Sequence, residues 1–197
     1  MAYLWAFAFT AVLIWSGINP KDQFTWFLEV APALVGGVAL LATYRRLRLT
    51  PMLYLLILAH SIILMVGGHY TYAEVPLFDT LAEWFGWQRN NYDKVGHFAQ
   101  GFIPVIVTRE ILIRLKVVNG PRWTDFLALS FCLAFSAFYE LIEWWVALLS
   151  GESAEAFLGT QGYEWDTQSD MGWCLFGGIV ALVTLGALHR RLIAALN

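Results

Sequence analysis

The stretch Met171–Leu188, with the sequence MGWCLFGGIVALVTLGAL, runs for eighteen residues without a charged side chain. A helix of about this length can cross the hydrocarbon core of a bilayer, because each residue adds about 1.5 Å along the axis. The whole chain shares this character: 59% of its 197 residues are hydrophobic, 14% are charged, and the mean hydropathy is +0.59. Soluble domains carry roughly 25% charged residues. The sequence therefore predicts an integral membrane protein.

Five further apolar stretches predict helices of the same kind. The weakest of them contains Arg109 and Glu110. No internal repeat divides the chain, so we expect a single all-α membrane domain over residues 1–197, folded as a bundle of six transmembrane helices. The predicted spans are 2–18, 24–44, 52–72, 95–115, 126–149 and 171–188.

Basic residues are distributed unevenly over this predicted topology. Cytoplasmic segments of membrane proteins carry an excess of Lys and Arg, and this bias sets the orientation. The bias predicts cytoplasmic N- and C-termini, because the outer segments then hold only Lys21, Arg89 and Lys94. The inner segments hold Arg45, Arg46, Arg48, Arg114, Lys116, Arg122, Arg190 and Arg191.

Acidic residues gather on the outer side of the same topology. Acids contribute little to orientation, so their gathering needs a separate reason. Of the loop and boundary acids, Asp125 alone falls on the inner side. The outer acids are Asp22, Glu74, Asp79, Glu83, Asp93, Glu152, Glu155, Glu164, Asp166 and Asp170.

Three pairs of ionisable residues near the outer helix ends are spaced to share a helix face. Residues three or four positions apart project from the same side of a helix. If the helices bundle, these faces converge on one pocket in the outer leaflet. The pairs are Asp93 with His97, Asp166 with Asp170, and Glu140 with Glu143.

Glu140 and Glu143 lie inside an apolar predicted span, where ionised carboxylates are costly. A charge at the membrane centre costs about 2.5–3.5 kcal/mol on insertion scales. A bound divalent metal ion would compensate the two acids, and mixed histidine and carboxylate sites suit zinc, iron or manganese. Facing helices of a bundle are known to supply such ligand sets. The predicted metal ligands are His69, Asp93, His97, Asp166 and Asp170.

The same residues have plainer interpretations. Asp93 and Asp170 each precede an apolar run, where an acid often caps a helix. His97 alone could be a hydrogen-bonded polar side chain without a ligand. Glu140 and Glu143 are the hardest to explain by structure alone, because they lie about two turns inside the span.

Four motifs at the outer helix ends are similar to those of a known family. They are Gly68-His69-Tyr70-Thr71-Tyr72; Asn91-Tyr92-Asp93 with His97-Phe98 and Gly101-Phe102; Glu140-Leu141-Ile142-Glu143-Trp144; and Gly159-Thr160-Gln161-Gly162 with Trp165-Asp166-Thr167-Gln168-Ser169-Asp170-Met171. Together they resemble the YjdF-type bacterial inner-membrane proteins, over nearly the whole chain. The resemblance implies a multi-pass protein of the bacterial inner membrane and implies no activity. A likeness of about a dozen residues to VanZ-like membrane proteins surrounds Asp93-Lys94 and His97-Phe98.

We predict from these residues a metal-dependent, hydrolase-like enzyme that acts on a lipid or lipid-linked substrate at the periplasmic face. A metal ion lowers the pKa of its bound water to about 7, and Glu140 or Glu143 would serve as the general base. The Trp-rich outer segment from Ala73 to Tyr92 is predicted to be a loop that covers the site. Membrane lipid is the expected partner, since no basic run indicates nucleic acid.

Two other functions stay open at this stage. Intramembrane acids and histidines also mark the ion paths of transporters. A path should continue inward, where the sequence offers only His60, Arg109 and Glu110, and no inverted repeat is visible. The third alternative is a non-catalytic membrane scaffold whose polar cluster holds the bundle together.

Overall fold

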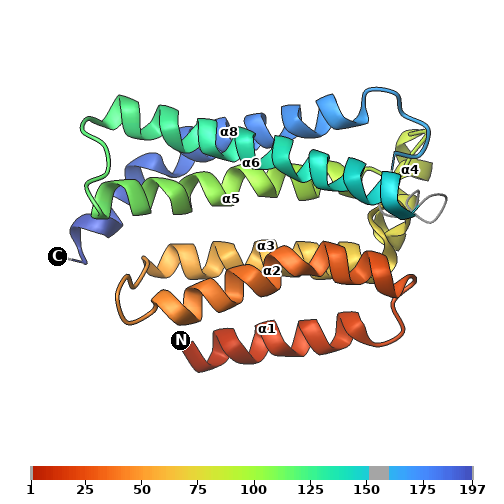
Figure 1. Ribbon diagram of the computed structural model, residues 1–197, viewed down its shortest axis with the longest axis horizontal. Coiled ribbons are helices and arrows are strands. Elements are labelled where there is room, and N and C mark those ends of the chain that lie inside the picture. Colours follow the sequence, from red (N-terminus) through yellow and green to blue (C-terminus); the bar gives the residue numbers. More distant parts are fainter. Residues whose placement is uncertain (1, 151–159, 197) are drawn as a thin grey trace.

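The computed structural model describes residues 2–150 and 160–196, and every regular element within these ranges is a helix. The prediction of an all-α protein is therefore confirmed. Glu152, Glu155 and Gly159 lie outside the described residues. The long helices run side by side (Figure 1), and they are α1 Ala2–Gly17, α2 Gln23–Thr43, α3 Pro51–Tyr70, α5 Tyr92–Arg114, α6 Pro121–Ser150 and α8 Asp166–Ala194.

Four of these helices, α2, α3, α6 and α8, are long and apolar enough to cross a membrane. Helix α1 is apolar but has sixteen residues. Helix α5 carries five charged residues, which are Asp93, Lys94, Arg109, Glu110 and Arg114. The described residues thus contain four candidate spans, and six crossings with cytoplasmic termini stay a prediction.

The helices begin where the local sequence favours a start. Helices α3 and α6 begin at Pro51 and Pro121, and proline suits the first turn because its missing N–H needs no partner there. Helix α2 follows Asp22, whose carboxylate accepts a hydrogen bond of 2.7 Å from the backbone N–H of Thr25. This hydrogen bond lowers the pKa of Asp22, as expected for an ionised N-cap.

Helices α5, α6 and α8 extend beyond the predicted spans. They begin at Tyr92, Pro121 and Asp166 instead of residues 95, 126 and 171, and α8 continues to Ala194 instead of ending at residue 188. Hydropathy marks the segment that suits lipid, whereas a helix continues into polar residues at the membrane surface. Hydropathy alone therefore does not predict where these three helices begin and end.

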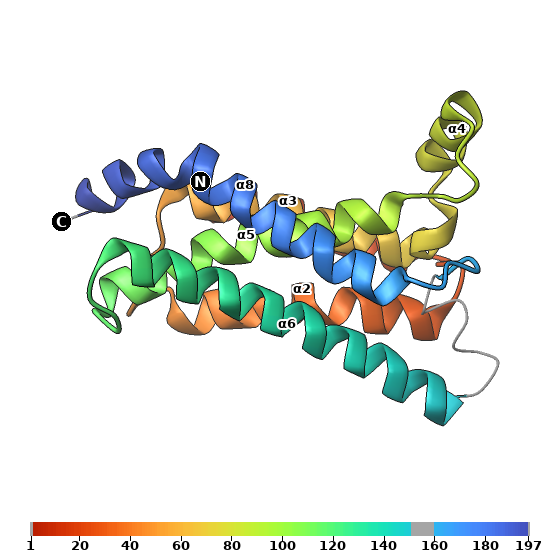
Figure 2. The ribbon, with the colours of Figure 1, turned by 90° about the horizontal axis from the view of Figure 1, so that it is seen from above.

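The segment between α3 and α5 is not the covering loop that the sequence predicted. It contains the short helix η1 Tyr72–Glu74 and the helix α4 Pro76–Phe85, which buries none of its residues. Figure 2 shows α4 standing away from the end of the bundle. The buried residues of this segment flank α4 instead, and they are Thr71, Tyr72, Val75 and Asn90.

The long helices form two groups of three. Helix α3 packs against α1 and α2, and α5 packs against α6 and α8. Contact between α3 and α5 joins the two groups, so these helices form the centre of the bundle. Both chain ends lie at one end of the bundle, opposite α4 (Figure 1).

Helices α5 and α8 approach each other closely enough for backbone contact. A Cβ atom at Gly101 of α5 would overlap the carbonyl of Cys174, and one at Gly177 of α8 would overlap the carbonyl of Phe98. Small residues allow this kind of helix crossing inside a membrane. The close contact sets the register of α5 against α8.

A charged network ties the helices together near the end that carries the termini. Arg109 is 1% exposed, and Glu110 and His189 are fully buried. Arg109 Nη1 donates to His189 Nδ1 at 2.9 Å, so His189 carries its proton on Nε2 and donates to Glu110 Oε2 at 3.0 Å. The two oxygens of Glu110 also accept hydrogen bonds from the N–H and hydroxyl of Thr50 at 2.9 and 2.8 Å. This network joins α5 and α8 to the start of α3.

Substitution of Gly177 by Ala is expected to loosen the contact between α5 and α8. The added methyl group meets a backbone carbonyl that cannot rotate away, so we expect the free energy of unfolding to fall by about 1–3 kcal/mol. The matched control is Gly172→Ala on the same helix, where a Cβ meets nothing within 4 Å. Thermal unfolding in detergent, followed by circular dichroism, measures both variants. Equal melting temperatures for the two would contradict the assigned register.

Substitution of Glu110 by Gln is expected to destabilise the protein strongly. Every hydrogen bond to Glu110 comes from a donor, and a Gln amide nitrogen cannot accept one. The amide would leave one of these buried donors unpaired and would remove the charged partner of Arg114, so the change should cost about 3–5 kcal/mol. Glu83→Gln, at an exposed position of α4, is the control. Unfolding in detergent with added denaturant measures the difference, and a Glu110→Gln protein as stable as the control would exclude a structural role for the network.

Candidate metal centre

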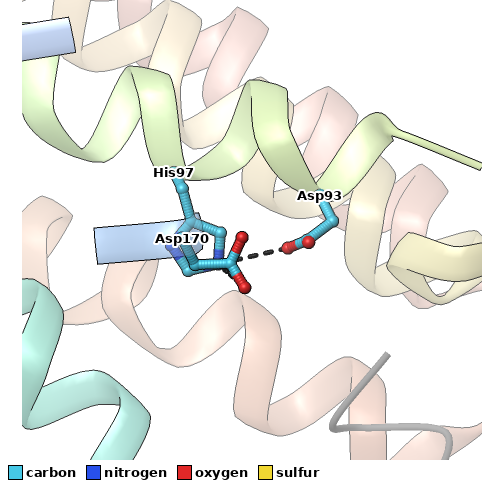
Figure 3. A group of neighbouring side chains, drawn as sticks. All are labelled: Asp93, His97 and Asp170. Carbon is cyan, nitrogen blue, oxygen red and sulfur yellow. Dashed lines mark ion pairs between the residues drawn. The ribbon is translucent and has the colours of Figure 1, made fainter. Parts of the chain in front are cut away.

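Three side chains from α5 and α8 meet near the end of the bundle that carries α4. Asp93 and His97 lie on the first two turns of α5, and Asp170 lies on the second turn of α8 (Figure 3). One ligand atom of each lies within 4.8 Å of the others. The three residues are buried, with exposed fractions of 8%, 8% and 3%. Neither acid is a helix cap, because the N-caps of α5 and α8 are Asn91 and Trp165.

The ring of His97 is oriented by a hydrogen bond on each side. Its Nδ1 lies 3.2 Å from Oε1 of Gln100, one turn further along α5. Its Nε2 lies 3.1 Å from Asp93 Oδ1 and 3.9 Å from Asp170 Oδ2. If Nδ1 donates to Gln100, Nε2 and the two carboxylate oxygens converge on a common point, where a cation must compensate them. That cation is either a second proton on His97 or a metal ion.

The remaining oxygens of the two aspartates face a pair of cations. Lys94 Nζ lies 2.6 Å from Asp170 Oδ1 and 3.3 Å from Asp93 Oδ2. Asp166 lies on this side and not with the triad, since its Oδ1 is 3.0 Å from Lys94 Nζ and 2.5 Å from Arg89 Nη1. Asp93 and Asp170 therefore bridge two groups: each has one oxygen toward His97 and one toward the cations.

A cavity of about 50 Å³ opens beside the triad and is lined by all three of its residues. Two further acids line it, Glu29 from α2 and Glu143 from α6. The volume suffices for a few water molecules, since each needs about 10–15 Å³ of such space. The structure thus brings Glu143 to the same cavity as Asp93, His97 and Asp170, as the helix spacing predicted.

Glu140 lies one turn before Glu143 on α6 and is 8% exposed. Its Oε1 is buried without a hydrogen-bond partner among the described residues. Its carboxyl group interacts electrostatically with His97. A buried carboxylate oxygen without a donor is uncommon and marks a place where a proton, a water molecule or an ion belongs.

Acids outnumber bases around this cavity. Six carboxyl groups lie at or next to it, and Arg89 and Lys94 are the permanently charged bases paired with them. Uncompensated charge in a medium of low polarity is expensive, so protons or a metal ion must balance the excess. The six acids are Glu29, Asp93, Glu140, Glu143, Asp166 and Asp170.

His69 does not join the triad, although the sequence predicted it as a metal ligand. Its Nδ1 lies 3.0 Å from the backbone carbonyl of Ser16, and its ring packs against Trp15 and Tyr70. These contacts hold the C-terminal end of α3 against α1. The sequence predicted that His69 lies at the end of a helix, but it did not predict which neighbouring helix His69 faces.

Several residues that line the cavity were not assigned to it by the sequence. Tyr72 packs so closely on Gly67 and Gly96 that a Cβ at either glycine would meet its ring. Tyr139 donates a hydrogen bond of 3.5 Å to Glu29 Oε2. The sequence could have predicted the contact between Gln100 and His97, because Gln100 follows His97 by three residues and so shares its helix face.

Hydrogen bonds between the two segments that precede α5 and α8 hold the starts of these helices together. The backbone N–H of Asn90 donates to Gln161 Oε1, and Gln161 Nε2 donates to the Asn90 carbonyl, both at 2.9 Å. Asn90 Nδ2 also donates to Asp79 Oδ1 at 2.7 Å. These bonds position Asp93 and Asp166, which follow the two loops directly.

Comparison with known proteins adds a family and a location. The sequence model of the family described as "Predicted membrane protein (DUF2238)" matches residues 1–191. "Inner membrane protein YjdF" of Escherichia coli (strain K12) is 52% identical over 186 residues, which cover 94% of this chain and 89% of that protein. No solved structure matches the chain. These findings confirm the predicted location in a bacterial inner membrane, and neither description names an activity.

Proposed function

This chain belongs to the DUF2238 family of predicted membrane proteins, as its YjdF-type motifs predict, and we propose that it is a metal-dependent hydrolase of the inner membrane. The proposed site lies in the outer half of the bundle, and its substrate is a lipid or lipid-linked molecule. The observation that carries the proposal is the convergence of Asp93, His97 and Asp170 within 4.8 Å beside an acid-lined cavity.

The donor set fits a divalent metal ion. One imidazole nitrogen and two carboxylate oxygens suit zinc, iron or manganese. Three protein ligands leave a further position for water or substrate, which is typical of catalytic sites. Gln100 supplies the outer hydrogen bond that metal-binding histidines usually make.

Glu143 and Glu140 are the proposed catalytic carboxylates. A metal ion in the triad would supply an activated water molecule, and a nearby carboxylate would take up its proton. Glu143 lines the cavity and is therefore the first candidate for the general base. Glu140 is buried next to it with an oxygen that lacks a hydrogen-bond partner, so it is the second.

A lipid substrate is supported by the surroundings of the cavity. Phe135 and Tyr139 of α6 line it. The neighbouring positions Phe138, Leu141 and Trp145 are exposed on the same helix, as expected for a face in contact with lipid. This apolar surface next to the cavity supports a substrate that has an apolar part.

The proposal includes six crossings with both termini in the cytoplasm. It is supported by the position of both chain ends at one end of the bundle (Figure 1). The clustered Arg and Lys residues flank helix ends at that same end, as the positive-inside rule requires. The acid-rich cavity then faces the periplasm.

A transporter is the second candidate, and His60 is the observation that favours it. His60 lines the cavity on α3, and its Nε2 is buried without a hydrogen-bond partner among the described residues. Intramembrane histidines of this kind occur in proton paths. Apolar residues oppose a continuous path: Val105 and Ile106 lie between His97 and Arg109 on α5, and both are fully buried.

Metal content tests the triad directly. Protein purified in detergent without chelator, supplied with zinc, iron or manganese and then desalted, should retain about one equivalent, because the three ligands form one site. His97→Ala and Asp170→Asn should each lose it. His69→Ala is the matched control and should retain the metal, since His69 faces α1. Inductively coupled plasma mass spectrometry gives the stoichiometry, and circular dichroism checks the fold.

Loss of metal from His69→Ala alone would return His69 to the ligand set and contradict the triad. A wild-type protein that retains none of the three metals would exclude the metal site altogether.

Glu143→Gln separates metal binding from catalysis. The variant should retain the metal, because Glu143 is outside the triad, and should hydrolyse lipid about 100-fold or more slowly, since it lacks the general base. The assay incubates the protein with bacterial polar lipid extract and quantifies new products by mass spectrometry. Glu164→Gln, outside the helices, is the control. Wild-type protein that carries metal yet forms no product, but moves protons across liposome membranes, would favour the transporter.

A further inference from the structure

A second hollow lies on the opposite side of the first turns of α5. This groove has a volume of about 520 Å³, within the range of roughly 300–1,000 Å³ that is usual for ligand sites. Its walls come from the segment around α4, from α5 and from the start of α8. The lining residues that matter here are Trp87, Arg89, Lys94, Phe98, Tyr163 and Trp173.

The first turns of α5 form the wall between the groove and the metal centre. Asp93 and His97 line the cavity, whereas Lys94 and Phe98, their neighbours along the chain, line the groove. Lys94 extends back through this wall to Asp170, with its Nζ at 2.6 Å from Oδ1. A ligand that contacts Lys94 in the groove would therefore be linked to the triad through the carboxylate of Asp170.

The groove combines two cations with apolar aromatic surface. The charged ends of Arg89 and Lys94 each lie 5.7 Å from the centre of the Tyr163 ring. Trp87 and Trp173, which are both exposed, add apolar surface to the groove. Among the described residues no acid lines the groove. This pattern suits a molecule with an anionic head and an apolar tail.

The carboxylates in the wall couple the groove to the metal centre. Asp93, Asp166 and Asp170 face Arg89 and Lys94, so these five groups carry one excess negative charge when all are ionised. A divalent metal ion bound at the triad turns this into an excess positive charge. The two cations are then partly released from the aspartates and can pair with an anion in the groove.

We propose that the groove binds a phosphate-bearing, anionic lipid, and that this lipid class is the substrate of the proposed metal centre. The assignment of substrate rests on the proposed function. The phosphate pairs with Lys94 and Arg89, and the adjoining chain lies on Trp87 and Trp173. Metal and lipid strengthen each other's binding, because both act on the charge of the same three aspartates.

Binding of dioleoyl phosphatidic acid to the full chain in detergent micelles tests the proposal, with native mass spectrometry as the readout. Phosphatidylcholine with the same chains tests the need for net negative charge. Glycerol 3-phosphate and inorganic phosphate, which lack the chains, test the need for a lipid. Each measurement is made with and without zinc.

We expect phosphatidic acid to bind about tenfold more tightly than phosphatidylcholine. Trp87→Ala and Trp173→Ala should each weaken it about fivefold. Trp84→Ala, exposed on α4 and outside the groove lining, should change it by about twofold at most. Zinc should strengthen binding by about fivefold in wild-type protein and not in His97→Ala.

Equal affinity for the two lipids, or displacement of phosphatidic acid by glycerol 3-phosphate, would overturn the lipid site. Absence of the zinc effect in wild-type protein that retains zinc would overturn the link to the metal centre. Failure of the groove is distinguishable from failure of the metal centre, because Trp87→Ala and Trp173→Ala should leave the zinc content unchanged. Wild-type protein that discriminates the lipids but retains no metal would contradict the metal centre and the substrate assignment together.

Discussion

Backbone contact between α5 and α8 determines where the chemistry of this protein can occur. Gly101 and Gly177 let the two helices approach until carbonyl groups take the place that side chains would occupy. Two pairs of interacting polar side chains follow from this register. Toward the end with α4 it sets His97 opposite Asp170, and toward the end with the chain termini it sets Arg109 opposite His189. The glycines carry no chemistry themselves, yet both charged clusters depend on them.

The two clusters differ in charge balance, and this difference separates a structural network from a candidate site. In the network around Glu110, the two acids are Glu110 and Asp125, and their partners are Arg109, Arg114 and a neutral His189. The hydrogen bonds among these five side chains measure 2.5–3.1 Å. The cluster around His97 has more acids than bases, lies beside a cavity, and includes an oxygen of Glu140 that has no hydrogen-bond partner among the described residues. A network in which acids and bases balance and polar atoms are hydrogen-bonded needs no ligand. An excess of acids beside a cavity needs protons or a metal ion to balance its charge.

The sequence predicted the helices and part of the site, and the reasons for its limits are physical. Hydropathy located each long helix, because lipid demands apolar side chains. Spacing put Asp93 and His97 on one face, and the structure places Asp170, also predicted as a ligand, beside them. Helix spacing describes one helix at a time, so it could not tell that His69 faces α1 or that Asp166 pairs with Arg89. His189 was missed because α8 continues beyond its apolar stretch.

X-ray absorption spectroscopy of the protein loaded with one equivalent of zinc tests the central claim most directly, because it reports which atoms surround the metal. The account predicts one imidazole nitrogen and carboxylate oxygens at about 2.0–2.2 Å, with the imidazole signal lost in His97→Ala. A spectrum of fully hydrated zinc, a sulfur ligand, or an imidazole signal that persists in His97→Ala would contradict a metal centre built from Asp93, His97 and Asp170.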